Sequence, residues 1–199
     1  MNANGRELIV GWWGRRSRVF ANIAAICCAV CVTSLAGQSQ PSEYEVEATY
    51  LYHFSHFVEW PAVLRQSDAG TFSICVLGQN PFGQALAETV ANENIDGKSV
   101  IAKQVPTADD AAGCRVLFIS SSEERKVKQI LATLSNASVL TVSDLPRFTE
   151  RGGMIQFVVE GSHVRFQVNV VTAKRAGLVM SSELLKLAAG VRNNFVFGN

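Results

Sequence analysis

The sequence predicts an α/β fold: a three-layer sandwich in which helices flank a mixed β-sheet, with an antiparallel hairpin and a helix at the C-terminal end. Two observations predict it. From residue 71 onward, apolar segments of strand length alternate with segments of helical pattern. Residues 154–160 and 163–171 form two strand-like segments with only a tight turn at 160–163 between them, which makes the sheet mixed. The composition, 48% hydrophobic and 18% charged residues, excludes a disordered chain, a collagen, a coiled coil and a many-span membrane protein.

The first 36 residues have the pattern of a secretory signal. Arg15, Arg16 and Arg18 precede an apolar run over residues 19–35, and Ser34-Leu35-Ala36 places small residues at a cleavage site. We therefore expect a signal peptide over residues 1–36 and a single domain over residues 37–199. An uncleaved membrane anchor is the alternative, although the run is shorter than the roughly 20 residues that a stable span needs.

The remaining elements follow from capping signals and apolar periodicity. Ser42 and Glu45 have the spacing of a capping box, so a helix begins at Ser42, and Trp60-Pro61 ends it. Ser181 or Ser182 caps the last helix. The pattern predicts strands over residues 71–77, 98–105, 115–120, 138–143, 154–160 and 163–171, and helices over about 83–92, 122–134 and 182–191.

The charge balance argues against nucleic acid as a partner. Four of the 18 basic residues and one of the 17 acidic residues lie in residues 1–36, so the rest of the chain has a net charge of −2. It contains no basic run. A mildly acidic domain of this kind has no surface for phosphate backbones.

Two cysteines remain once residues 1–36 are removed, Cys75 and Cys114. In an oxidising compartment, two cysteines predict one disulfide. Two separate buried thiols are the alternative. A metal site is not expected, because the two thiols lack partners at ligand spacing.

No motif supports catalysis, a metal or a cofactor. His53 and His56 lie three residues apart on the first helix, but we expect a solvated or core-edge role for them, and His163 falls in a turn. The loop 78–83 lacks the Lys-Ser/Thr of a phosphate loop. Residues 120–122 are expected to cap a helix rather than to bind an anion.

An ordered set of segments resembles the YfiR family of periplasmic regulators. The resemblance covers about residues 43–191. Its segments are EVEATYLYHFSHFVEWP (45–61), FSICVLG (72–78), NPFG (80–83), CRVLFIS (114–120), VLTVSD (139–144), GGMI (152–155), Phe166 with Asn169, AGL (176–178) and SSELLKLA (181–188).

The resemblance implies an exported inhibitor without enzymatic activity. Such proteins bind the periplasmic part of an inner-membrane diguanylate cyclase and hold it inactive, which limits cyclic-di-GMP and biofilm formation. An outer-membrane lipoprotein can sequester the inhibitor, and the family forms homodimers. Cys75 and Cys114 match a family disulfide. A second cysteine pair found in some members is missing here, because residues 145–159 contain no cysteine.

The partner surface is expected to use apolar anchors near the first helix and before the last one. The candidates are Tyr52, Phe57, Trp60, Leu178 and Met180, and ordinary core packing is the alternative for each. An exposed disulfide near this surface would make repression sensitive to reduction.

Two other functions compete with the inhibitor. A periplasmic small-ligand binding domain would hold its ligand at the carboxyl ends of parallel strands, near residues 78–83 and 120–122. A hydrolase with an unrecognised site is the less favoured alternative, because it would need an acid, a base and a nucleophile in one cleft.

Overall fold

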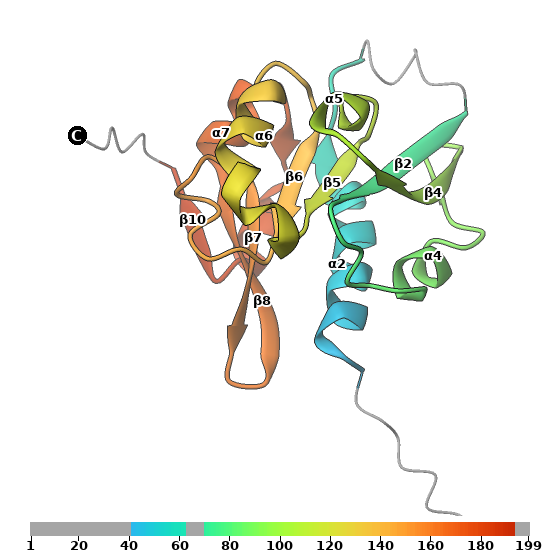
Figure 1. The fold of residues 1–199 in the computed structure, drawn as a ribbon, viewed down its shortest axis with the longest axis horizontal. Coiled ribbons are helices and arrows are strands. Elements are labelled where there is room, and N and C mark those ends of the chain that lie inside the picture. The colour runs from blue at the N-terminus through green and yellow to red at the C-terminus, as the bar shows by residue number, and fades with distance from the viewer. Residues whose placement is uncertain (1–40, 63–69, 194–199) are drawn as a thin grey trace, which may run out of the picture. The chain divides into compact units, whose positions relative to one another are not determined.

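The computed structural model describes residues 41–62 and 70–193 (Figure 1). The expected signal peptide lies outside the described residues. Eight strands form one sheet in the order β10-β8-β7-β6-β5-β2-β4-β3. Their bounds are Thr71–Leu77 (β2), Asn94–Ile95 (β3), Lys98–Val105 (β4), Val116–Ile119 (β5), Leu140–Ser143 (β6), Ile155–Glu160 (β7), His163–Asn169 (β8) and Gly190–Arg192 (β10).

The sheet is mixed, as the sequence predicts. Strands β4, β2, β5, β6 and β7 are parallel neighbours. Strands β7 and β8 form the expected antiparallel hairpin, with a turn at Gly161, where the backbone is left-handed (φ 64°). Strand β10 then pairs in parallel with β8, and β3 pairs antiparallel with β4.

Helices cover both faces of the sheet. They are α2 (Glu43–Phe57), α4 (Ala85–Thr89), α5 (Ala108–Ala111), the 3₁₀ helix η1 (Ser121–Lys126), α6 (Val127–Thr133), α7 (Val170–Arg175) and α8 (Ser182–Leu187). Side chains of β2 alternate between two cores: Ile74 and Val76 pack in the core with α2, α4, α7 and α8, whereas Leu77 packs in the core with α5 and α6. The three-layer prediction is therefore confirmed.

The first helix begins and packs as its sequence predicts. The Ser42 Oγ accepts the Glu45 amide at 3.3 Å, and the Glu45 carboxylate accepts the Ser42 amide at 2.6 Å, so the capping box is complete. On the sheet side, the Phe54 ring lies 5.0 Å from the ring of Phe166 and 5.8 Å from that of Phe157. Helix α2 is thereby fixed across the β7–β8 hairpin.

Several predicted boundaries are wrong. The strand expected over 163–171 ends at Asn169, whose side chain accepts the Thr172 amide at 3.0 Å and starts α7. The last helix ends at Leu187 rather than near 191, and β10 follows it. The helix expected over 122–134 begins as 3₁₀ turns, and the one over 83–92 shortens to α4. Helix α5, strand β3 and a small sheet of β1 (Val58–Glu59) and β9 (Val179–Met180) were not expected.

The described cysteines form one disulfide. Cys75 on β2 is bonded to Cys114 just before β5, and their Cα atoms lie 6.0 Å apart. The two residues are 0% and 1% exposed, inside the core that contains α5 and α6. The expectation of an exposed disulfide is therefore wrong, because the native fold shields both sulfur atoms from a reducing agent.

Helix α2 carries a buried carboxyl group, that of Glu47. Glu47 is 0% exposed, and within residues 41–62 and 70–193 neither of its oxygens has a hydrogen-bond partner. The Oδ1 of Asp144, which follows β6, also lacks one there. The Tyr44 hydroxyl donates to the other Asp144 oxygen at 3.3 Å. Burial raises the pKa of Glu47 to about 8, and the nearby charges of Asp144 and Glu43 add to the shift. Burial also raises the pKa of Asp144.

Candidate functional site

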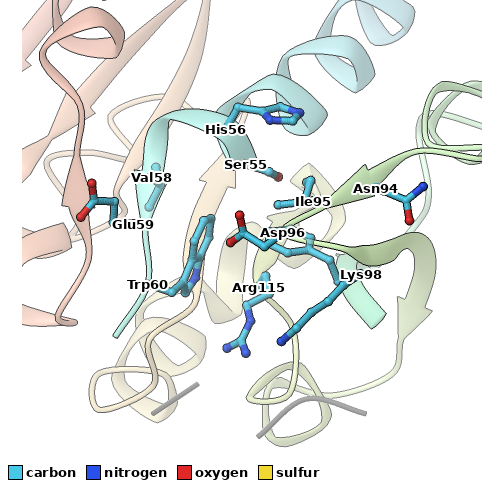
Figure 2. A pocket seen from close by; sticks show the side chains of 11 residues that line it. Ser55, His56, Val58, Glu59, Trp60, Asn94, Ile95, Asp96, Lys98 and Arg115 are labelled. Carbon is cyan, nitrogen blue, oxygen red and sulfur yellow. The ribbon is translucent and has the colours of Figure 1, made fainter. Parts of the chain in front are cut away.

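A cavity of about 500 Å³ opens at the amino-terminal ends of β2, β4 and β5 (Figure 2). We call it the amino-edge hollow. Four separate segments form it: the end of α2 with β1, the start of β2, the β3–β4 turn, and the residue before β5. The lining residues are Ser55, His56, Val58, Glu59, Trp60, Phe72, Asn94, Ile95, Asp96, Lys98 and Arg115.

Local sequence explains how these segments meet. The Trp60 and Phe72 rings pack edge to face, with centroids 5.3 Å apart, and form an apolar wall. Asp96 and Gly97, both with positive φ (51° and 76°), make the two-residue turn that joins β3 to β4. Pairing of Val58 with Met180 holds the chain as it leaves α2.

The hollow has charges of both signs. Lys98 and Arg115 are cationic, whereas Glu59 and Asp96 are carboxylates. Figure 2 shows the Lys98 and Arg115 side chains extending on the same side of the hollow as Trp60, with Asp96 between them and Ser55. The Trp60 Nε1 is buried and has no hydrogen-bond partner among the described residues.

The lining residues do not form a nucleophile–base pair. The Ser55 hydroxyl donates to the Leu51 carbonyl at 3.3 Å and is buried, while His56 is exposed. An activated nucleophile needs a base within hydrogen-bond reach. Ser55 does not meet this requirement, because its hydroxyl donates to a backbone carbonyl.

Comparison with known protein families shows to which family the chain belongs. A family profile described as YfiR/HmsC-like matches residues 44–189. The chain belongs to the YfiR/HmsC-like family. The resemblance inferred from the ordered segments is thus confirmed.

One solved structure agrees with the fold of this YfiR/HmsC-like chain. A conserved domain protein from Vibrio cholerae O1 biovar El Tor superimposes with a TM-score of 0.52 at 13% identity, over 77% of this chain and 62% of that one. The chain therefore spans less than two thirds of that protein. An ABC domain in complex with L-Trp from Streptococcus pneumoniae matches with a TM-score of 0.45 at 14% identity, over 60% of this chain and 55% of that one. At these identities the first match shows a shared fold alone.

The structure separates the five expected anchors of the YfiR/HmsC-like chain into two groups. Leu178 is 0% exposed and Met180 is 8% exposed, so both belong to the core with α2, and Trp60 is buried in the wall of the hollow. Tyr52 and Phe57 are only partly buried. These two remain accessible to a partner.

Tyr52 is the centre of a surface patch of aromatic rings on α2. Its ring lies 5.5 Å from the His53 ring and 4.9 Å from the His56 ring, and its hydroxyl donates to the Glu93 carboxylate at 2.6 Å. We call Tyr52, His53, His56 and Phe57 the α2 patch. Since His56 also lines the hollow, the patch and the hollow are continuous.

The histidines do not gather into a metal centre. His53, His56 and His163 are all exposed, and among residues 41–62 and 70–193 no group of three or more metal-ligating side chains occurs. No helix in this part of the chain is both long enough and apolar enough to span a bilayer.

Hydrogen bonds join the loops at the carboxyl edge of the parallel strands. The expected proximity of the two loops is present: the Gln79 amide donates to the Ser122 Oγ at 2.9 Å, and the Gln104 Nε2 donates to the Gly78 carbonyl at 2.6 Å. The Ser120 Oγ accepts the Ser122 amide at 3.4 Å, as a cap. A cavity of about 230 Å³ lies beside these loops, lined by Leu77 and Thr107 among others. The cavity of about 500 Å³, which sequence reasoning missed, lies at the opposite, amino-terminal edge.

Proposed function

We propose that this chain is an exported regulator that binds the periplasmic part of an inner-membrane diguanylate cyclase and holds the enzyme inactive. Repression would lower cyclic-di-GMP in the cytoplasm and restrain biofilm formation. The match to the YfiR/HmsC-like family over residues 44–189 is the observation that carries the proposal. The family is regulatory rather than catalytic, and the mixed-charge hollow without a nucleophile–base pair is consistent with that role.

Two features support a periplasmic location. Residues 1–36 have the charged, apolar and small-residue order of a secretory signal. The Cys75–Cys114 disulfide also suits an oxidising compartment, because structural disulfides are rare in the bacterial cytosol.

The α2 patch and the amino-edge hollow together are the proposed partner surface. Tyr52 and Phe57 supply aromatic contact area, and the adjoining hollow supplies charges of both signs. Aromatic residues beside a pocket are common anchors of binding energy. Repression from mostly active to mostly inactive needs roughly 5.5 kcal/mol of preference for the inactive cyclase, which a few such anchors can provide.

The proposal extends to assembly and release. As the resemblance implies, the regulator is a homodimer, and an outer-membrane lipoprotein relieves repression by sequestering it. Competition between the lipoprotein and the cyclase for the same regulator would link the two membranes without any catalytic step.

Affinity purification from cross-linked cells tests the partner surface. The wild-type chain should recover a membrane diguanylate cyclase. His56→Asp should weaken recovery, because it places a negative charge where the α2 patch meets the hollow. His163→Asp is the matched control, since His163 is also exposed but lies at the start of β8. Equal recovery by both variants would reject this surface, and absence of any cyclase would reject the function.

A small-ligand sensor is the second candidate, and a cavity of about 500 Å³ lined by charged side chains of both signs favours it. A thermal-shift screen with periplasmic metabolites separates the two functions, since a tight ligand raises the melting temperature by mass action. A stabilising metabolite together with failure to recover a cyclase would favour the sensor.

A further inference from the structure

A second cavity, of about 260 Å³, lies between α6, α7 and the chain that leads from β6 into β7. We call it the α6–α7 cavity. Helices α6 and α7 are neighbours in Figure 1. None of its lining residues belongs to the amino-edge hollow or to the α2 patch. It is therefore a separate feature of the surface.

All the charged residues that line the α6–α7 cavity are cationic. They are Lys128 from α6, Arg151 from the segment before β7, and Arg175 from α7. The amino-edge hollow differs, because two carboxylates there offset two cations. Three cations around one concave surface create a positive potential that attracts anions.

The guanidinium of Arg151 is held in place from outside the cavity. Its Nη2 donates to the Glu124 carbonyl at 2.9 Å, and its Nη1 lies 3.8 Å from the Glu124 carboxylate. Glu124 belongs to η1 and does not line the cavity. A guanidinium has five N–H donors, so these contacts fix its position and leave further donors for a ligand.

The rest of the wall is largely apolar. Leu134 and Met154 are buried, and Leu131 is partly buried against the same core as α6. At Gly152, which has a positive φ of 100°, no heavy atom lies within 4 Å of the position a Cβ would take, so the backbone leaves this side of the cavity open. The cavity thus combines an apolar wall with a cationic rim.

We propose that the α6–α7 cavity binds a small organic anion, a carboxylate or a phosphate monoester on a short apolar body. The cations would pair with the anionic group, and the apolar body would pack against Leu131, Leu134 and Met154. The cavity is slightly smaller than pockets for drug-sized ligands, which limits the size of the apolar body that it can hold. This inference is independent of the cyclase, because it concerns direct binding to the chain alone.

Isothermal titration of the exported protein with four probes tests the chemistry. Benzoate and phenyl phosphate carry both features, benzyl alcohol lacks the charge, and inorganic phosphate lacks the apolar body. At least one of the first two should bind at least about tenfold more tightly than both partial probes, since a charge-assisted hydrogen bond contributes roughly 1.5–3 kcal/mol. The tighter of the two identifies the anionic group. No saturable binding of either one up to millimolar concentrations, or equal binding by a partial probe, would overturn the inference.

Neighbouring cations on α7 supply a matched pair of variants. Arg175→Gln should weaken binding of the better probe about tenfold, whereas Lys174→Gln should leave it unchanged, because Lys174 is exposed on the same helix but does not line the cavity. The melting temperature of each variant without ligand gives the folded fraction at which binding is compared. Equal weakening by both substitutions would show attraction to net charge only and would overturn the site.

Discussion

Replacing the buried Glu47 by glutamine should remove a pH-dependent penalty on folding. In the unfolded chain this carboxyl group has a pKa near 4.5, whereas burial raises its pKa in the folded protein to about 8. Between these values the folded state binds more protons than the unfolded state, so stability falls as pH rises. Below about pH 4.5, Glu47 does not lower the unfolding free energy. The unfolding free energy then falls as pH rises to about 8, and above that pH it no longer changes through Glu47.

The magnitude follows from the pKa difference. One pKa unit corresponds to about 1.4 kcal/mol, so the penalty from Glu47 is roughly 3 kcal/mol at pH 7 and about 5 kcal/mol above pH 8. Glu47→Gln cannot ionise, so the penalty disappears. The unpaired amide adds a constant offset that does not depend on pH, so the change of stability with pH is the informative quantity.

Urea denaturation between pH 5 and pH 9 measures this effect. The difference in unfolding free energy between Glu47→Gln and the wild type should grow by several kcal/mol over this range. Glu88→Gln, which removes an exposed carboxylate from α4, should give a curve parallel to the wild type. A parallel curve for Glu47→Gln as well would refute the reasoning that burial holds this group protonated.

Two further predictions concern packing. Replacing Cys75 and Cys114 together by serine should lower the unfolding free energy by about 4 kcal/mol, because the disulfide closes a loop of 39 residues; a thiol reagent should label the reduced native wild type only after denaturation, and labelling without denaturant would contradict the burial. Gly153→Ala should cost about 1–3 kcal/mol, because its Cβ would overlap the buried Phe148 ring, whereas Gly113→Ala has open space; equal melting temperatures for the two variants would contradict the overlap.

Local sequence signals predict much of the fold. The Ser42–Glu45 capping box starts α2 where expected, and apolar segments of strand length place β2, β4 and β7 within a residue of their observed bounds. These signals act between residues close in sequence. They can therefore be recognised without knowledge of the tertiary structure.

Other features depend on distant residues and could not be predicted in this way. Val170, Val171 and Thr172 are β-branched and favour a strand, yet the Asn169 cap makes them the start of α7. Strand β10 exists because β8 offers an edge, and no local pattern encodes that edge.

The proposed partner surface shows the same division. The sequence predicts Tyr52 and Phe57 on the first helix as anchors, but the amino-edge hollow combines four segments whose proximity only the fold creates. Leu178 and Met180 follow α7 as an apolar segment that suits a core and an interface equally well. The structure shows that both side chains are buried in the core with α2, which the local sequence does not indicate.

The central claim is repression of a membrane cyclase from the periplasm, and cellular cyclic-di-GMP tests it most directly. Deletion of the chain should raise cyclic-di-GMP, and re-expression of the full 199 residues should restore the low level. A chain without residues 1–36, expressed to the same level, should fail to restore it, because it stays in the cytoplasm. Unchanged cyclic-di-GMP on deletion, or full restoration by the chain without residues 1–36, would contradict the account.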